Sequence, residues 1–497
     1  MNRVGDYGLS IGFFAMFAIF GSLNFSTVFS LAPYINEISI TILSLLLFTG
    51  AMSKSAQLFL HSWLPGSMEA PTPVSALLHA ATLVTAGIYL LLRSSPILEY
   101  SPTALLVMAL IGASTAFFGA TVGLVTNDLK RVIAMSTISQ LGYMVLAIGL
   151  SQYNVSLLHT VGHAFFKALL FLGAGAVIHS WVDQQDIRKM GGLIRFLPFT
   201  YVAMLVGTLS LVACPWLTGF YSKELILSLG YGTYSFSGMY CYILGSLGAC
   251  FSAFYSFRLI SLVFLTVPNG LKSSYTQVNE SNWAVVIPLF ILALFSIFFG
   301  YVFSDLFVGQ GSDFFGNALY VNPNNISLIE AEFSLPILVK LLPAILSLLG
   351  ATSAVYIYHV NPEFIVDLTN SNLGRKVYTF LNGKYFFDVL YNHYIISLGL
   401  KLGYTISKVL DRGVIELLGP YGLSSALNKA ALSISMSDTR VISTYSTYII
   451  FNALVLIFIV FSPILVDSSL LFEIRMIIIY IAASLQVLSP GFRGLTL

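Results

Sequence analysis

Three basic side chains recur at helical spacing, and two lysines flank them along the chain. His159, His163 and Lys167 stand at i, i+4 and i+8, so a helix would place all three on one stripe. Histidine titrates near neutral pH, and burial allows a lysine to release its proton there. Such a stripe could pass protons between Lys54 and Lys223, each of which lies inside a long apolar run.

Each of these residues also has a purely structural interpretation. H-x-x-x-H is a zinc spacing, but no carboxylate or thiol adjoins it and Lys167 follows one turn later, so no metal site is predicted. The two histidines could instead bond carbonyl groups across helices, and either lysine could extend to the membrane interface. His79 could link Lys54 to the later residues, or it could make a helix–helix contact.

Charged neighbours of the two lysines are further candidates. Arg3 and Asp6 stand at i, i+3 and are predicted to form an ion pair that tunes Lys54. Glu224 follows Lys223 directly, so on a helix the two side chains point about 100° apart. Glu224 is therefore expected to face another helix, as a possible partner of the pathway.

The composition predicts the class of protein in which these residues lie. Hydrophobic residues make up 57% of the chain and charged residues 9%, with a mean hydropathy of +0.87, which predicts an all-α polytopic membrane protein. A net charge of +2, three scattered cysteines and the absence of a nucleotide-binding loop predict neither nucleic acid nor a cofactor in this chain. Apolar runs predict about eleven spans, at 7–30, 37–61, 75–92, 103–125, 131–150, 155–180, 193–214, 217–268 (a short piece and a full span), 283–306, 336–359 and 444–466.

Two of these segments are predicted to be discontinuous helices. Gly50–Lys54 and Gly219–Lys223 share the pattern G-x-x-S-K, which suggests two structural repeats with a lysine in corresponding positions. Residues 385–437 are too polar to span but apolar along one side, so a long amphipathic helix is predicted on the membrane surface, interrupted near Gly419-Pro420. Basic residues gather in alternate loops, which places those loops in the cytoplasm or the mitochondrial matrix.

Five stretches resemble the antiporter-like subunits of respiratory complex I. They are NRVGD at 2–6, KSAQLFLHSWLPGSMEAPTPVSALLHAATLVTAGIYLL at 54–92, DLKRVIAMSTISQLGYM at 128–144, HAFFKALLFLGAGAVIH at 163–179 and GFYSKELIL at 219–227. The long C-terminal extension is typical of the subunit 5 group within that family. The resemblance is dense up to residue 230 and is carried by architecture beyond residue 270.

The resemblance implies a proton-translocating subunit driven by redox chemistry elsewhere. NADH, FMN, iron–sulfur clusters and ubiquinone are then expected in other subunits. The family's roles would assign Lys54 to the first half-channel, His79 to its connection, His159, His163 and Lys167 to the central relay, Lys223 to the exit side, and Arg3 with Asp6 to a modulating pair. The surface helix would lie across neighbouring antiporter-like subunits, in lipid. The mitochondrial inner membrane is the expected location, with a bacterial plasma membrane as the alternative.

One departure from the family shapes the expected organisation. Family members begin with about five further helices, including one with a glutamate that partners the first lysine, and we expect a separate polypeptide to supply them. The resulting divisions are 1–93 (an incomplete first inverted repeat), 103–268 (the second repeat), 282–360 (additional spans), 385–437 (the lateral helix) and 444–497 (an anchor helix and tail). The alternatives are a subunit of a multisubunit cation/proton antiporter and a structural clamp that has lost transport.

Overall fold

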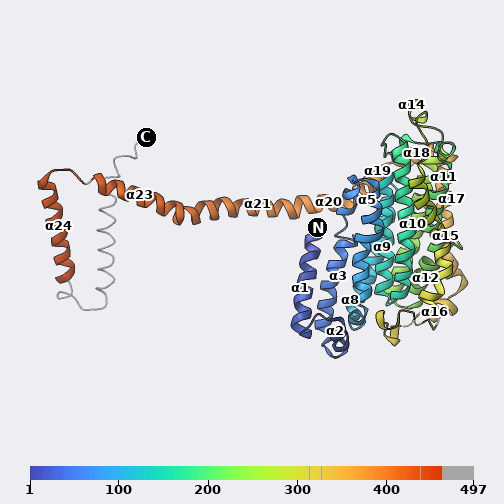
Figure 1. The fold of residues 1–497 in the computed structure, drawn as a ribbon, viewed down its shortest axis with the longest axis horizontal. Coiled ribbons are helices and arrows are strands. Elements are labelled where there is room, and N and C mark those ends of the chain that lie inside the picture. The colour runs from blue at the N-terminus through green and yellow to red at the C-terminus, as the bar shows by residue number, and fades with distance from the viewer. Residues whose placement is uncertain (310, 313, 326, 437, 462–497) are drawn as a thin grey trace. The chain divides into compact units, whose positions relative to one another are not determined.

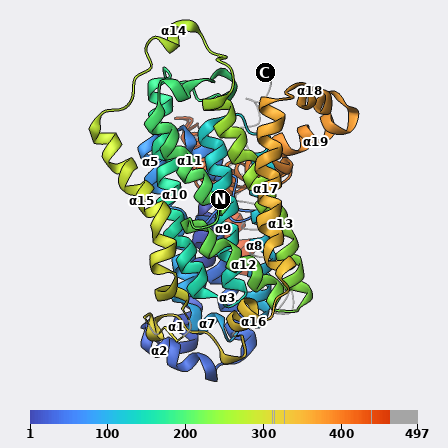
Figure 2. The same cartoon turned by 90° about the vertical axis from the view of Figure 1, so that its right-hand side faces the viewer.

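The computed structural model describes residues 1–461 apart from 310, 313, 326 and 437, and the chain divides into two units. The first unit, Met1–Asp388, is a bundle of helices that stand side by side (Figure 1, Figure 2). The second unit begins at Val389. Among the described residues, extended backbone pairs only in one bridge, between Asp128 and Asp186. The predicted all-α class is confirmed.

Nine helices within the described residues are long and apolar enough to cross a membrane, and two shorter apolar helices accompany them. Together they match the predicted set of about eleven. The nine are α1 (Asn2–Phe20), α3 (Glu37–Lys54), α5 to α6 (Thr72–Arg93), α8 (Pro102–Gly123), α9 (Leu129–Gly149), α10 (Tyr153–Ser180), α13 with its π-helical end (Phe236–Leu265), α15 (Trp283–Val308) and α17 (Ile337–His359), and the shorter two are α11 (Pro198–Val212) and α24 (Ile442–Phe461).

The first span is shorter than the predicted segment 7–30. Helix α1 ends at Phe20 because Gly21 adopts a left-handed conformation, with φ at 69°, and α2 (Phe25–Leu31) is a separate helix. The N-terminal end of α1 lies part-way along the bundle and not at its end (Figure 1).

The first predicted discontinuity falls directly after Lys54. Helix α3 ends there, and Ala56 and Phe59 take positive φ values of 47° and 74°, which no α-helix allows. The chain then forms two short helical pieces, α4 (Trp63–Gly66) and η2 (Ser67–Glu69), before α5 (Thr72–Ala76). A π-helical stretch, η3 (Leu77–Thr82), joins α5 to α6 (Leu83–Arg93).

The second discontinuity lies between α11 and α12 (Thr218–Gly232), as predicted from Cys214-Pro215. Ala213 and Trp216 take positive φ values of 71° and 69° there. A Cβ atom on Gly219 would lie 1.8 Å from the Ser210 carbonyl oxygen, so only glycine lets α12 start this close to α11. Each break thus adjoins one of the two G-x-x-S-K lysines.

Helices α8, α9 and α10 form the centre of the first unit. A Cβ atom on Gly142 would lie 2.5 Å from the Ala116 backbone nitrogen, and one on Gly112 would lie 2.5 Å from that of Leu146. Small residues therefore bring the backbones of α8 and α9 into close contact, as is common between membrane helices. Helix α9 is buried almost throughout, so its polar side chains face other helices and not lipid.

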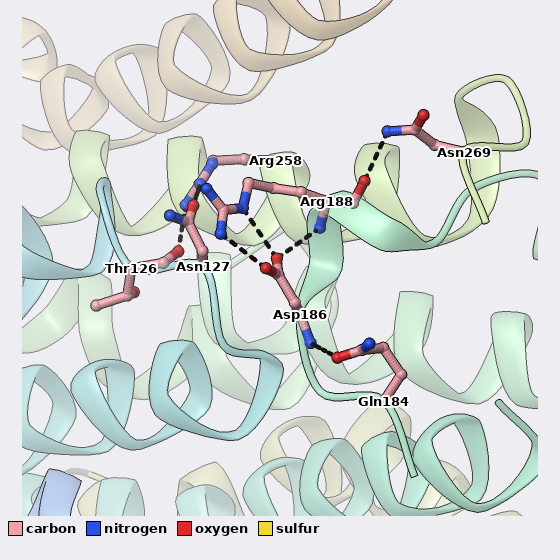
Figure 3. A network of polar contacts seen from close by, with 7 residues as sticks. All are labelled: Thr126, Asn127, Gln184, Asp186, Arg188, Arg258 and Asn269. Atoms are coloured by element: carbon pink, nitrogen blue, oxygen red, sulfur yellow. Dashed lines mark hydrogen bonds and ion pairs between the residues drawn. The ribbon is translucent and has the colours of Figure 1, made fainter. Parts of the chain in front are cut away.

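A polar network joins three loops near the basic end of the bundle (Figure 3). Arg258 of α13 donates to the Thr126 carbonyl and to the Asn127 side chain, both at 2.6 Å. Asp186 accepts two hydrogen bonds from the Arg188 guanidinium, at 3.0 and 2.7 Å. These bonds hold the pKa of the Asp186 carboxyl below its usual range. Two backbone hydrogen bonds, from the Leu129 amide to the Gln185 carbonyl at 2.9 Å and from the Ile187 amide to the Asn127 carbonyl at 3.0 Å, fix the loop before α9 against the loop after α10.

The loop charges separate between the two ends of the first unit, as predicted. Helices α14 (Lys272–Tyr275) and α19 (Asn372–Asn382) lie at one end, and they carry Lys272, Arg375 and Lys376 (Figure 2). Helix α16 (Leu328–Phe333), with Glu330 and Glu332, lies at the other end. The other short helices are α7 (Ser95–Leu98), α18 (Glu363–Asn370) and α20 (Phe387–Leu390).

The second unit confirms the predicted long helix and its interruption. Helical segments follow one another from Tyr391 to Leu418, as η10 (Tyr391–Ile396), α21 (Ser397–Thr405), η11 (Ile406–Ile415) and α22 (Glu416–Leu418). Gly419 leaves helical geometry, at φ −94° and ψ −123°, and α23 (Pro420–Met436) follows. No residue of 389–432 is buried in this chain. Residues 462–497 of the predicted anchor and tail lie outside the described residues.

Candidate functional site

The lysine at the first break is paired with a carboxylate from another helix. The Lys54 ammonium lies 3.1 Å from the Asp6 carboxylate of α1, and the side chains are 35% and 38% exposed. The predicted Arg3–Asp6 pair is not among the ion pairs of the described residues, where the carboxylate of Asp6 meets Lys54 instead. The i, i+3 spacing considered only one helix, whereas the contact is made between α1 and α3.

His79 lies on the π-helical stretch η3 and is buried. Its ring is 5.9 Å from the Trp63 ring, centroid to centroid, and the Trp63 indole N–H donates to the Ser53 carbonyl at 2.8 Å. Because η3 also packs against α10, His79 lies between the residues around Lys54 and the histidines of α10. The linking role of His79 stays a prediction.

The stripe on α10 is fully inside the bundle. His159, His163 and Lys167 are each 1% exposed or less. The Lys167 ammonium donates to the Ser136 hydroxyl and to the Ile133 carbonyl of α9, the latter at 3.3 Å. Neither ring nitrogen of His163 has a hydrogen-bond partner in the described part of the chain. A buried polar ring in this position can be satisfied by an ordered water.

His159 makes a hydrogen bond at each ring nitrogen. Nδ1 lies 2.8 Å from the Ser222 hydroxyl of α12, and Nε2 lies 3.0 Å from the Gln140 side-chain oxygen of α9. The ring centroids of His159 and His163 are 6.5 Å apart. His159 therefore connects the stripe on α10 to the helix that carries Lys223.

Lys223 occupies the second break without an ion pair. Its ammonium donates to the Ser252 hydroxyl at 3.1 Å and to the Leu211 carbonyl at 3.5 Å, and it lies 5.4 Å from the centre of the Tyr143 ring. The side chain is 1% exposed. Its direct contacts among the described residues are thus hydrogen bonds to neutral groups and the face of an aromatic ring, while the Glu224 carboxylate acts on it at longer range.

Glu224 points away from Lys223, as its position in the helix predicted. No ion pair joins the two side chains among the described residues, and Glu224 lines a cavity of about 610 Å³ instead. Asp305, Glu332 and Lys340 line the same cavity, from α15, α16 and α17. Acidic side chains therefore line a cavity between the helix of Lys223 and α16.

Sequence inspection missed the neutral residues that hold the basic ones. Ser136 and Gln140 of α9, and Ser222 and Ser252, make the hydrogen bonds just described. The polar run Ser136–Gln140 inside a predicted span was a usable signal for the first two. His61 was given no role, although it is fully buried against the Phe118 ring, at 4.4 Å between centroids, and neither ring nitrogen has a partner in the described residues.

Two family patterns cover most of the chain. The family described as NADH:quinone oxidoreductase/Mrp antiporter, TM, matches residues 1–252, and NADH dehydrogenase subunit 5 C-terminus matches 255–314 and 323–461. The chain belongs to the NADH dehydrogenase subunit 5 family. The resemblance first noted in the five motifs is thereby confirmed, and it includes the C-terminal region, where no motif had been found.

Relatives within this family are similar over nearly the whole chain. NADH-ubiquinone oxidoreductase chain 5 of Schizophyllum commune is 66% identical over 480 residues, which are 97% of this chain and 70% of the relative. The protein of the same name from Mycosarcoma maydis is 63% identical over 92% of this chain and 68% of the relative.

A solved structure supports the antiporter-like fold. A chain in the Mrp complex from Dietzia sp. DQ12-45-1b superposes with a TM-score of 0.64 at 24% sequence identity. The match covers 87% of this chain and 45% of that chain. At this identity the likeness concerns the fold, which it shares with the family match.

Proposed function

We propose that this chain is a proton-translocating membrane subunit of an NADH:ubiquinone oxidoreductase. The buried row His159, His163, Lys167 and Lys223 carries the proposal, because each side chain is 1% exposed or less inside an apolar bundle. Ionisable groups inside a membrane are costly and typically line ion pathways. The relatives named NADH-ubiquinone oxidoreductase chain 5 give the enzyme to which such a pathway belongs.

In this proposal the protons follow the residues in their spatial order. Lys54, modulated by Asp6 and Arg3, receives a proton in the first half of the chain, and His79 connects it to α10. His163, His159 and Lys167 form the central relay. Lys223 delivers the proton towards the exit, where Glu224 and its acidic cavity lie beyond it.

The energy for this transport comes from outside the chain. Moving one charge against 100 mV costs about 2.3 kcal/mol, and the pathway residues cannot supply it themselves. We assign NADH oxidation, with its FMN and iron–sulfur clusters, and ubiquinone reduction to other subunits. This chain then acts as an enzyme subunit with no redox centre of its own.

We further propose that a partner membrane subunit packs against α1. Tyr7 and Phe14 are 71% and 75% exposed on this helix, and the nearby Lys54–Asp6 pair is about a third exposed. A charged pair within spanning helices is expensive in contact with lipid, so protein is the better neighbour. We propose that further membrane helices cover this face, that the long helix 391–436 lies across adjacent antiporter-like subunits, and that the assembly resides in the mitochondrial inner membrane.

The first experiment tests transport in the assembled enzyme. Protons moved per NADH oxidised are measured in membrane vesicles for wild type, Lys223→Ala and Lys167→Ala, with the exposed Lys272→Ala as the matched control. Both buried variants are expected to lower the ratio, while electron transfer to an artificial acceptor continues and the complex stays assembled. An unchanged ratio in both buried variants would contradict the proposed pathway.

The partner is tested separately by cross-linking. A photoreactive residue in place of Tyr7 is expected to cross-link to a membrane subunit of the complex, identified by mass spectrometry. Cross-linking to lipid alone would contradict a partner on this face.

A further inference from the structure

The serine of the second G-x-x-S-K motif has no role in the pathway described so far. Ser222 is 1% exposed and directly precedes Lys223 on α12. Its hydroxyl lies 2.8 Å from Nδ1 of His159, and the opposite nitrogen of that ring lies 3.0 Å from the Gln140 side-chain oxygen. Two neutral side chains from two helices therefore hold the ring of His159, which itself comes from a third.

These contacts select one tautomer of the neutral ring. In the orientation that the Gln140 amide has here, its oxygen faces Nε2 of His159 and can only accept a hydrogen bond, so Nε2 carries the hydrogen. Nδ1 is then an acceptor, and the Ser222 hydroxyl donates to it. With Nε2 already protonated, an incoming proton can add only at Nδ1, the nitrogen that faces the helix of Lys223.

We propose that Ser222 is a positioning residue of the relay, whose hydroxyl reverses when His159 takes up a proton. This inference rests on the proposed function of the chain. Once Nδ1 carries a proton it donates to Ser222 Oγ, and the hydroxyl hydrogen turns to the Gly219 carbonyl of its own helix, 3.4 Å away. The serine keeps its own hydrogen throughout, and no bond to Oγ breaks.

The reorientation of the Ser222 hydroxyl links the charge of His159 to α12, the helix that carries Lys223. The imidazolium is stabilised by an oxygen at each nitrogen, although Lys223 and His163 lie nearby and are basic. Without the serine oxygen, the protonated Nδ1 would lose its acceptor in a buried site, and a buried unsatisfied donor is costly. Ser222 therefore matters more to the protonated ring than to the neutral one.

The corresponding serine of the first repeat is arranged differently. The Ser53 hydroxyl donates to the Gly50 carbonyl of its own helix at 2.9 Å, and its side chain packs against Gly5 of α1. None of the hydrogen bonds of the described residues joins Ser53 to a histidine. The histidine contact is thus a property of the second break and does not follow from the shared motif.

The decisive experiment is Ser222→Ala in the assembled enzyme. We expect the rate of NADH-driven proton transport to fall by roughly tenfold or more, and with it the protons moved per NADH, because one hydrogen bond to a charged group is lost. Ser222→Thr, which keeps the hydroxyl, is expected to restore most of the ratio. Ser246→Ala is the matched control, since Ser246 is also buried and its hydroxyl bonds only the Ile243 carbonyl of its own helix.

The second arm tests whether serine and glutamine act through the same ring. Gln140→Leu removes the other contact, and its effect combined with Ser222→Ala is expected to be clearly less than the product of the single effects. Equal ratios for Ser222→Ala and Ser246→Ala, or no restoration by threonine, would overturn the inference. If the alanine variant does not assemble, Ser222→Cys replaces it, with an intermediate loss expected and a wild-type ratio as the contradicting result.

Failure of the inference and failure of the proposed function give different results. If the wild-type enzyme moves no protons during NADH oxidation, the proposed function itself is wrong. If wild type and Ser222→Ala both move protons at the same ratio, only the role of Ser222 is wrong.

Discussion

The two breaks carry the same motif but hold their lysines in opposite surroundings. Lys54 is about a third exposed and pairs with the Asp6 carboxylate at 3.1 Å, whereas Lys223 is 1% exposed and its hydrogen bonds within the described residues go to neutral groups. Solvent and a carboxylate in direct contact therefore stabilise the charge of Lys54, whereas in the described part of the chain the Glu224 carboxylate acts on Lys223 only at longer range. The G-x-x-S-K motif places a lysine next to a helix break. The neighbouring helices supply the groups that compensate its charge.

This difference suggests that the two lysines have different roles in the pathway. A lysine in contact with a carboxylate suits the end where a proton is taken up, because opposite charges at this distance attract. A lysine whose direct neighbours are hydroxyl and carbonyl groups has no ion-pair partner in contact with it. If the comparison holds, giving Lys223 a carboxylate should harm transport more than taking the carboxylate away from Lys54.

The largest effect is expected from adding that carboxylate. Ser252→Asp would place an acidic group where a hydroxyl now lies 3.1 Å from the Lys223 ammonium. Close buried charge pairs couple by about 1.5–7 kcal/mol, so release of the proton should slow by roughly tenfold or more. The measurement is NADH-driven proton translocation in vesicles.

Ser252→Asn is the control for this change, since it has the shape of aspartate without the charge. It should retain most of the transport, and Ser252→Asp should not. Equal transport in the two variants would break the comparison, because charge compensation at Lys223 would then be unimportant.

A smaller effect is expected at the first break. Asp6→Asn removes the only carboxylate paired with Lys54 among the described residues, and we expect about a tenfold fall in transport, equivalent to about 1.4 kcal/mol. Asp6→Glu, which keeps the charge, should fall much less. Proton translocation per NADH is again the measurement.

The size of the Asp6→Asn effect also reports on the partner proposed at α1. Ion pairs in contact with bulk water contribute only about 0.2–1 kcal/mol. A fall of less than twofold would therefore place the pair in water within the assembled complex, against a covering subunit.

The sequence predicted the elements better than the contacts between them. Apolar runs located the spans, and the residues Cys214-Pro215 located the second break, because both signals are local. The end of α1 was misplaced, since the effect of Gly21 depends on one left-handed residue inside an apolar stretch. The Asp6–Lys54 pair and the Gln140 and Ser222 contacts of His159 were not foreseen, because each joins residues from different helices whose packing the sequence does not display.

The smallest effect is expected at an ion pair that is exposed to water. This pair tests whether exposure to water weakens an ion pair. Asp186 pairs with Arg188, whose side chain is 60% exposed, in the loop after α10 (Figure 3). Arg188 lowers the pKa of the Asp186 carboxyl, so its contribution to stability is present above the unfolded value of about 3.9 and is lost as the pH falls through the lower folded value.

Hydrogen exchange at the neighbouring bridge measures this contribution. The Ile187 amide bonds the Asn127 carbonyl at 3.0 Å, and its protection at pH 6 should fall by at most about fivefold in Asp186→Asn, because such pairs contribute up to about 1 kcal/mol. The difference between variant and wild type should begin to shrink below about pH 3.9, where the carboxyl of the opened form becomes protonated, and should vanish once the pH lies below the lower folded pKa of Asp186. A loss above tenfold at pH 6 would mean that exposure does not set the strength of these pairs, and the contrast between Lys54 and Lys223 would then need another cause.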